Sequence, residues 1–314
     1  MDFHQLRSFV QVADLGSFTR AASVLQTAQP ALSRQVRALE VELRQPLFDR
    51  NGRGVTLTPA GTRLLAHARG ILQQVERARQ DLESQRGAAS GLLCVALPPS
   101  VGRTLTAPLV EAFRTRFPAA TLSMVEGLST TTLEWLVQGR VDCAVVYNAT
   151  PAAAIALLPV LQERLYLVSA RRPAQRGLLG RPAPLATVAE RALVIPGRPH
   201  AIRMRLETAM AEAGLKPCVG LEIDSVPAIL DLVQRHADQG WHAVLSLNAI
   251  HGSGQPAAFS ARPITLAAGG AKARPLNASL WIATSAQRPR GALLEQAVAL
   301  LADMLRSTLA PPAV

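Results

Sequence analysis

Residues 6–61 read LRSFVQVADLGSFTRAASVLQTAQPALSRQVRALEVELRQPLFDRNGRGVTLTPAG, and this stretch decides the fold of the N-terminal part. Apolar residues recur at helical spacing in three segments that are separated by turn signals. The first segment stops at Gly16, the second begins at Ser17, which can cap a helix, and the third begins around Pro30. Two short helices joined by the tight segment 26–28 are typical of a helix-turn-helix.

The third helix and the segment after it carry polar residues that suit a nucleic-acid surface. Ser33, Arg34 and Arg37 lie near the start of this helix, where side chains can reach base edges in a major groove. Residues 47–57 contain an Asn-Gly turn and predict a short basic β-hairpin, or wing. A helical packing module with solvated arginines is the alternative, which the ordered combination of helices and basic hairpin disfavours.

This block closely resembles the DNA-binding domain of the LysR-type transcriptional regulators, a mainly α winged helix-turn-helix. The shared pattern is present as Gly16-Ser17-Phe18-Thr19-Arg20-Ala21-Ala22, Gln29-Pro30-Ala31-Leu32-Ser33 and Thr56-Leu57-Thr58-Pro59-Ala60-Gly61. The resemblance implies that the start of the third helix contacts bases and nearby phosphates, and that the wing tip reaches phosphate or the minor groove. The predicted DNA-binding residues are Thr19, Arg20, Gln29, Pro30, Ser33, Arg34, Arg37 and Arg53.

The composition is that of a globular protein of about two domains. Of the 314 residues 49% are hydrophobic, and no run approaches the roughly eighteen apolar residues of a membrane span. The formal charge of +11 divides into +4 for residues 1–90 and +7 for the remainder, so the DNA prediction depends on the motif. No secretory leader is visible and Cys94, Cys143 and Cys218 are widely spaced, which predicts a cytoplasmic location. A thiol switch at Cys218 stays an open alternative.

Residues 58–86 predict one long helix, with Thr58 as its N-cap and Pro59 in its first turn. Apolar residues recur there at alternating steps of four and three, which is typical of a coiled-coil seam. The seam could instead be the buried face of a bundle helix. Its place between two domains favours dimerisation, and in the resembling family this helix pairs two chains. The seam residues are Leu64, Ala68, Ile71, Val75, Ala78 and Leu82.

From Leu92 onward short strands alternate with helices, which predicts an α/β domain. Strands are expected at 92–97, 121–126, 143–147, 165–170, 192–195, 219–223, 244–247 and 279–283, and helices at 104–117, 131–138, 200–213, 226–237 and 293–305. This order resembles the family's two-lobed effector domain, which has the fold of periplasmic solute-binding proteins.

The resulting domain boundaries are a winged helix-turn-helix at 1–58, a linker and dimerisation helix with its hinge at 59–91, and an effector-binding domain at 92–314. Within the effector domain, lobe I is expected at about 92–162 and 268–314, and lobe II at about 163–267.

Ligands in open α/β folds bind at the carboxyl ends of strands, where helix N-termini attract anions. Such junctions are expected at 98–102, 127–131, 196–203 and 224–226, and in the family they line the cleft between the lobes. The candidate effector-binding residues are Ser100, Val101, Gly102, Ser129, Thr130, Tyr147, Arg198, His200, Arg203 and Ser225.

Each of these candidates also has a structural explanation. Serine and threonine hydroxyls at such positions often only cap a helix. Arg198 and Arg203 flank a predicted helix start and therefore suit a carboxylate or phosphate, which predicts a small organic anion as the effector. Either arginine could equally form an ion pair within the protein.

Residues 236–246 depart from the family's pattern. One glycine of a glycine-rich turn is replaced, and Ser246 stands where the family usually has proline. Trp241 and His242 could also reshape this wall of the cleft. The identity of the ligand therefore cannot be transferred from the family.

An enzyme is disfavoured, because the sequence has no nucleophile elbow, no phosphate-binding loop and no metal-ligand spacing among its six histidines. We therefore expect no catalytic residue, metal or cofactor. The sequence predicts a transcription factor that binds double-stranded DNA as a homodimer or homotetramer and responds to a small-molecule effector, with RNA polymerase as a further candidate partner. A solute-binding protein or α/β enzyme of the same fold is the alternative.

Overall fold

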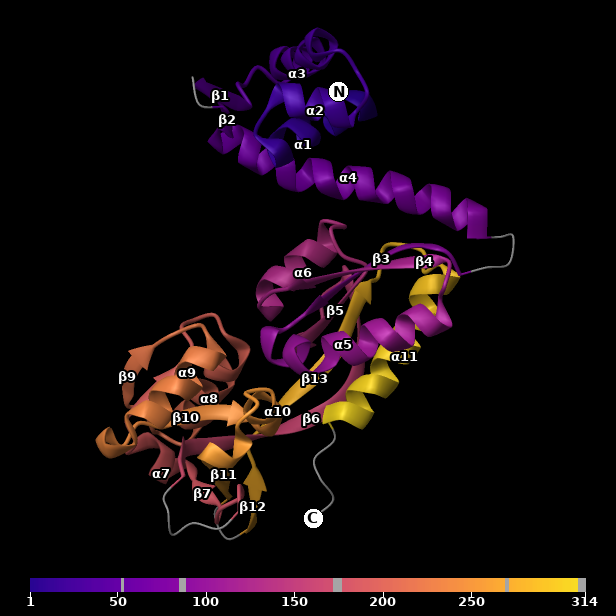
Figure 1. Cartoon of the computed structure of the whole chain (residues 1–314). Helices are drawn as coiled ribbons and strands as arrows, with labels where there is room; N and C mark the ends of the chain where they lie inside the picture. Colours follow the sequence, from indigo (N-terminus) through magenta and orange to yellow (C-terminus); the bar gives the residue numbers. More distant parts are fainter. Residues whose placement is uncertain (52–53, 85–88, 172–176, 269–270, 310–314) are drawn as a thin grey trace. The chain divides into compact units, whose positions relative to one another are not determined.

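The computed structural model describes residues 1–51, 54–84, 89–171, 177–268 and 271–309. They form two compact units (Figure 1). Unit 1 covers Met1–Ala88 with the short segment Gln138–Arg140, and unit 2 covers Ala89–Val137 and Val141–Val314. No helix of the described ranges combines the length and apolar character needed to cross a membrane.

Unit 1 is a winged helix-turn-helix followed by a long helix, as the sequence predicts. Its elements are α1 (Phe3–Leu15), α2 (Phe18–Val24), α3 (Gln29–Leu43), β1 (Phe48–Asn51), β2 (Gly54–Leu57) and α4 (Pro59–Ser84). The core includes an aromatic group in which the ring of Phe48 lies 5.2 Å from that of Phe9 and 5.8 Å from that of Phe18. These contacts join α1, α2 and the wing into one packed body.

Two local devices connect the wing to the helices. Gly16 ends α1 with a φ of 59°, a conformation that favours glycine, and its carbonyl accepts a hydrogen bond of 3.2 Å from the Val55 amide of β2. Thr58 caps α4: its Oγ1 accepts from the Gly61 amide at 2.9 Å and donates to the Pro46 carbonyl at 2.7 Å. The predicted N-cap at Thr58 is therefore confirmed.

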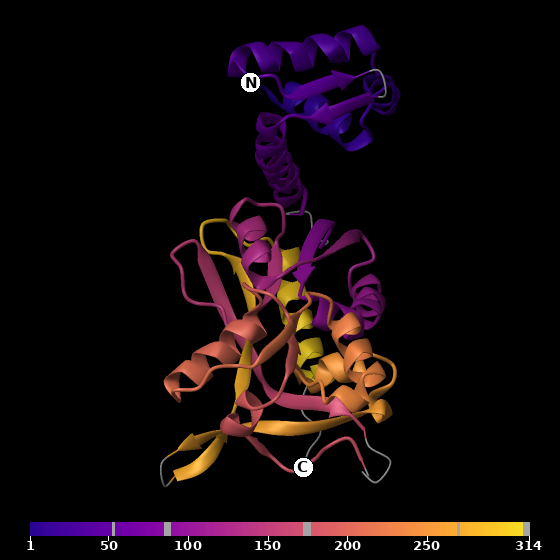
Figure 2. The same cartoon turned by 90° about the vertical axis from the view of Figure 1, so that its left-hand side faces the viewer.

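Unit 2 consists of two lobes that share one long strand, β6 (Ile155–Ala170). Its first ten residues pair with β13 (Asn277–Ser285), and its last six pair with β10 (Ala243–Ser246) and β11 (Phe259–Ala268). Figures 1 and 2 show this strand passing from one lobe into the other.

In the first lobe, β4 (Ala120–Glu126), β3 (Gly91–Leu97), β5 (Cys143–Tyr147), β13 and β6 lie side by side in that order. Alternate residues of each strand face opposite sides of the sheet. One side packs against α5 (Pro99–Arg116) and α11 (Ala292–Leu309), and the other packs against α6 (Ser129–Val137).

The second lobe surrounds the far half of β6. Its further elements are β7 (Ala183–Pro184), α7 (Leu185–Ala189), β8 (Leu193–Ile195), α8 (Ala201–Glu212), β9 (Val219–Glu222), α9 (Val226–Arg235), α10 (Leu247–His251) and β12 (Ala271–Pro275). β8 and β9 form a separate parallel pair.

Several elements differ from the sequence-based expectation. The first half of β6 was not expected, and Pro159 interrupts its pattern; the register with β13 shifts at this point, where a residue without an N–H is tolerated. Strands β11 and β12 were also not expected. Because they form a hairpin, the chain returns to the first lobe near 275–277 rather than at the expected lobe boundary of about 267–268. Helix α5 begins at Pro99 instead of Thr104, since proline fits the first helical turn.

Candidate DNA-binding surface and ligand pocket

Helix α3 has a buried apolar face and an exposed polar face. Leu32, Val36 and Leu39 are buried, whereas the side chains at 29, 30, 33, 34 and 37 fall on the other side of the helix. Arg34 and Arg37 are exposed, and neither forms an ion pair or hydrogen bond within the described ranges. Two guanidinium groups are therefore available on this face to an anionic partner.

The other predicted DNA-binding residues cluster around the start of α3 and the start of α2. The Gln29 amide donates to Ser33 Oγ at 3.1 Å, and Ala28, the N-cap of α3, makes no side-chain capping bond. Pro30 and Thr19 are exposed, and the Arg20 guanidinium donates to the Leu15 carbonyl at 2.5 Å. Arg53 lies outside the described residues.

The residues of the predicted dimerisation seam of α4 lie in two different environments. Ala68 is fully buried, and Leu64 and Ile71 pack against the same core of unit 1. Val75 is half-buried and Ala78 is exposed, and neither belongs to that core, while the side chain of Leu82 lies outside the description. The first half of the seam therefore packs within its own unit, whereas Val75 and Ala78 lie outside that core.

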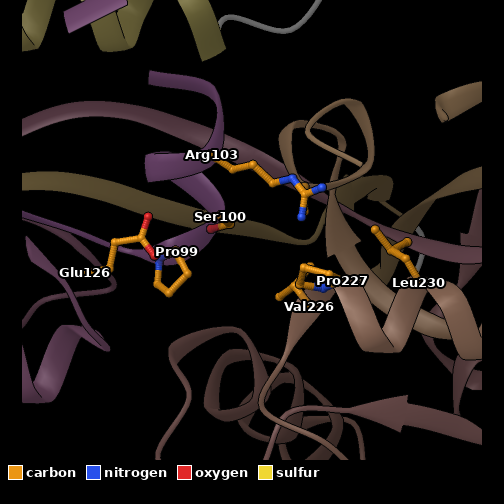
Figure 3. A pocket seen from close by; sticks show the side chains of 8 residues that line it. Pro99, Ser100, Arg103, Glu126, Val226, Pro227 and Leu230 are labelled. Atoms are coloured by element: carbon orange, nitrogen blue, oxygen red, sulfur yellow. The ribbon is translucent and has the colours of Figure 1, made fainter. Parts of the chain in front are cut away.

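A pocket of about 280 Å³ lies between the lobes of unit 2 (Figure 3). The first lobe contributes mainly polar side chains and the second lobe only apolar ones. The lining residues are Pro99, Ser100, Arg103 and Glu126 from the first lobe, and Val226, Pro227, Leu230 and Ala249 from the second. Ser100 is the one predicted effector residue among them; Ser225 adjoins the pocket as the N-cap of α9 and accepts from the Ala228 amide at 3.4 Å.

A buried asparagine connects the two lobes beside this pocket. The Asn248 side-chain amide of α10 donates to the Ser100 carbonyl at 3.0 Å. The Thr104 hydroxyl of α5 donates to Asn248 Oδ1 at 2.8 Å. Because both bonds join α5 to α10, they hold the first-lobe wall of the pocket against the second lobe.

A second buried polar group lies where β6 passes between the lobes. The Tyr147 hydroxyl donates to Glu163 Oε2 at 2.5 Å, and the hydroxyl of Ser246 faces the same carboxyl without a hydrogen bond of normal geometry. Burial raises the pKa of Glu163 from about 4.5 to about 6, although the two hydroxyls lower it in part. Burial, and then the charge of Glu163, raise the pKa of Tyr147 well above its ordinary value, so its hydroxyl stays a donor.

The two arginines predicted to bind an anion are both paired within the protein. Arg203 is buried, with its Nε 2.5 Å from Glu207 Oε1 and its Nη2 3.3 Å from Glu222 Oε1. Arg198 forms a 2.9 Å ion pair with the same Glu207. Burial alone would raise the pKa of Glu207, but the hydrogen bonds from Arg203 and Arg198 outweigh it and lower that pKa. Neither arginine lines the pocket. The sequence allowed either an anion-binding site or an ion pair within the protein, and the structure contains the ion pair.

The remaining candidates have mostly structural contacts. Ser129 Oγ accepts from the Tyr147 amide at 3.0 Å, and His200 Nδ1 accepts from the Ile202 amide at the start of α8, at 3.3 Å. Burial lowers the pKa of His200, and the charge of Asp224 opposes this effect. Val101 and Gly102 are buried in the first turn of α5, and Thr130 is exposed.

The sequence-based reasoning missed Arg103 and Glu126, the two charged residues of the pocket wall. Because α5 begins at Pro99, Arg103 lies one turn after Ser100 on the same side of the helix. This spacing from Ser100 is the sequence signal by which Arg103 could have been found. The expected α5 began at Thr104, which placed Arg103 in a loop. Trp241, expected near the cleft, instead packs against Gly220 and donates to Gln239 Oε1 at 2.9 Å.

Comparison with family models identifies both halves of the chain. Residues 3–62 match the model described as "Bacterial regulatory helix-turn-helix protein, lysR family", and residues 86–243 match "LysR substrate binding domain". The chain is 36% identical over 230 residues to the nitrogen assimilation regulatory protein nac of Escherichia coli (strain K12), which covers 73% of this chain and 74% of nac. It is 32% identical over 219 residues to the transcriptional regulator BbuR of Bordetella bronchiseptica (strain ATCC BAA-588 / NCTC 13252 / RB50), covering 69% and 67%.

Solved structures share the fold over nearly the whole length. CbnR, a LysR family transcriptional regulator, aligns with a TM-score of 0.67 at 23% identity, over 99% of this chain and 100% of CbnR. Full-length CbnR in complex with its target DNA gives a TM-score of 0.67 at 24% identity, over 98% and 100%. A full-length OxyR variant from Pseudomonas aeruginosa gives 0.68 at 23% identity, over 98% and 95%.

Proposed function

Because the chain belongs to the LysR family of transcriptional regulators, which bind DNA, carry an effector-binding domain and are not enzymes, we propose that α3 reads its operator and that the pocket between the lobes holds its effector. The observation that carries the first half is the exposed face of α3, on which Arg34 and Arg37 have no partner among the described residues. Phosphate contacts by such groups supply affinity, and contacts to base edges supply specificity.

Pairing of two chains through the later part of α4 fits this function. A two-fold dimer presents two recognition helices to successive major grooves, about one helical turn apart. CbnR, which shares the fold, has been solved in complex with its target DNA, and this supports DNA binding by the present chain. We propose the cytoplasm as the place of action, because the operator DNA lies there.

The effector half of the proposal rests on the pocket and its position. A ligand that contacts both walls binds the closed arrangement of the lobes better than an open one, and so shifts the balance between them. A change in lobe arrangement alters how effector domains associate and thereby the spacing or bend of the bound DNA.

Electrophoretic retardation of the DNA upstream of the protein's own gene, or of a neighbouring divergent gene, tests the proposed function. We expect a retarded complex that persists in excess unrelated DNA and weakens steeply with salt, because phosphate contacts release counterions. Arg37→Ala should weaken the complex, whereas Arg114→Ala, an exposed arginine of α5 in unit 2, should not. Equal retardation of operator and unrelated DNA would contradict sequence-specific binding.

A further inference from the structure

The pocket between the lobes is lined by two residues of opposite charge, one cationic and one anionic. Arg103 and Glu126 are exposed and line the pocket, and within the described part of the chain neither forms an ion pair or hydrogen bond. By contrast, Arg198 and Arg203 elsewhere in unit 2 are both paired with Glu207. The pocket therefore keeps one cationic and one anionic group available to a ligand.

The position of Glu126 is set by its packing on α5. A Cβ atom at Gly102 would lie only 2.4 Å from Glu126 Oε1, so the absence of a side chain at Gly102 gives the carboxylate its place against the first turn of the helix. The helix dipole favours a negative charge at this end. In Figure 3 the carboxylate lies beside Pro99, on the far side of the pocket from Leu230.

Arg103 points the other way. Its aliphatic stem passes close to the second lobe, since its Cδ would lie 3.4 Å from a Cβ at Gly252. Figure 3 shows the guanidinium reaching toward the side formed by Val226, Pro227 and Leu230. The two charges are therefore held apart, with the polar Ser100 between them and an apolar wall opposite.

We propose that the effector is a small zwitterion, whose anionic group binds Arg103, whose cationic group binds Glu126, and whose short apolar body packs on Val226 and Pro227. This inference rests on the proposed function, because it assigns a ligand class to the same pocket. A purely anionic ligand would leave Glu126 unpaired next to a negative charge, and a purely cationic one would do the same to Arg103. The volume of about 280 Å³ lies at the small end of ligand pockets, which suits a metabolite of few atoms.

Binding of unbranched ω-amino acids, from 3-aminopropanoate to 6-aminohexanoate, to the full-length protein tests whether the ligand needs both an anionic and a cationic group. Thermal unfolding is followed at increasing ligand concentration, with hexanoate and hexylamine as the ligands that carry one charge each on a six-carbon chain, as in 6-aminohexanoate. We expect one chain length to raise the melting temperature most, since its charges match the separation of the two side chains. The single-charge ligands should bind at least about tenfold more weakly.

Charge-removing variants assign each end of the ligand. Arg103→Gln and Glu126→Gln should each weaken binding of the best ω-amino acid by about ten- to hundredfold. In Glu126→Gln the preference for the amino acid over hexanoate should largely disappear, and in Arg103→Gln so should the preference over hexylamine. Arg114→Gln and Glu111→Gln, at exposed positions of α5 outside the pocket, make the same changes in net charge and should leave binding unchanged. Gly102→Ala, which displaces the Glu126 carboxylate, should act like Glu126→Gln.

Two outcomes would overturn the proposal. One is stabilisation by hexanoate or hexylamine that equals or exceeds that of every ω-amino acid. The other is the absence of any effect from either pocket variant. Retardation of operator DNA by the ligand-free protein is measured in parallel. A failed ligand series with intact DNA retardation removes the zwitterion, whereas lost retardation removes the proposed function itself.

Discussion

At the scale of single residues, the most unusual group is the buried Glu163 on the strand that the two lobes share. It is 6% exposed, and its known donor is the Tyr147 hydroxyl. Ser246, where the family usually has proline, places one more hydroxyl beside it. The sequence departure noted at this position thus lies within the polar group at the lobe junction.

Glu163 should make the stability of unit 2 depend on pH. Its folded pKa of about 6 exceeds the ordinary value near 4.5, so between these pH values the folded protein keeps a proton that the unfolded chain releases. Stability therefore falls as pH rises through this window, by about 2 kcal/mol once pH exceeds 6. Glu163→Gln should remove this loss, and its amide can donate to Ser246.

Urea unfolding at pH 4.5 and pH 7.5 measures this effect. We expect Glu163→Gln to gain stability relative to the wild type at pH 7.5 but not at pH 4.5. Glu111→Gln, an exposed carboxyl of α5, should behave like the wild type at both. Parallel pH dependence of the wild type and Glu163→Gln would disprove the assignment.

Arg34 is the residue on which base readout should depend most. Its guanidinium is exposed one turn after Pro30 on the outer face of α3, and no described residue pairs with it. Arg34→Ala should lower affinity for the operator by about 1–3 kcal/mol and relax sequence preference, because a bidentate contact to a base is lost. Titration of operator and mismatched DNA at constant salt measures both effects; an equal loss on both sequences would point to a phosphate contact instead.

At the scale of elements, only the first part of the apolar seam of α4 packs into the core of its own unit. Leu64, Ala68 and Ile71 complete the core of the winged helix-turn-helix, and Thr58 fixes the start of the helix through two hydrogen bonds. Val75 is half-buried in the isolated chain but lies outside that core. The part of the seam that does not pack within its own unit is the surface that we propose for the pairing of two chains.

Val75→Glu should therefore break the dimer without unfolding the protein. In a paired seam the new carboxylate would be buried without a partner, at a cost of several kcal/mol. Light scattering at micromolar concentration should show at least a dimer for the wild type and a smaller species for the variant. Thr62→Glu, at an exposed position of α4 that lies off the seam, adds the same single charge and serves as the control. A monomeric wild type would rule out this assembly.

At the scale of the whole molecule, the two units have separate hydrophobic cores. One buried cluster contains Phe9 and lies in unit 1, and three others, including the one around Phe113, lie in unit 2. Cores that share no buried side chains can unfold independently, which suits a regulator whose DNA-binding and sensing parts must respond to different partners.

Calorimetry should accordingly resolve two unfolding transitions. Phe9→Ala and Phe113→Ala each remove a fully buried ring, at a cost of about 3–5 kcal/mol. The first substitution should lower only the transition of unit 1, and the second only that of unit 2. Operator DNA should raise the former, since a ligand stabilises the part that binds it. A single transition that moves with both variants would contradict independent cores.

The sequence alone determined the elements whose signals are local. Helical spacing, the Ser17 and Thr58 caps and the Asn-Gly turn lie within a few residues of what they specify, so the winged helix-turn-helix and the start of α4 follow from them. The outward face of α3 follows from the same periodicity, because the buried positions leave 29, 30, 34 and 37 exposed and Ser33 half-buried on the same side. The family resemblance rests on the same contiguous block.

Only the tertiary structure decided the pairing between distant side chains. Arg198 and Arg203 lie beside a helix start in the sequence, but whether they face a ligand or Glu207 depends on how α8 folds against its neighbours. The pocket likewise brings Arg103 and Glu126 next to residues that are a hundred or more positions away in the sequence. The lobes that carry them are joined by β6, whose first half was not expected because Pro159 interrupts its strand pattern. Periodicity reports which face of an element is buried, whereas a binding site depends on which elements meet there.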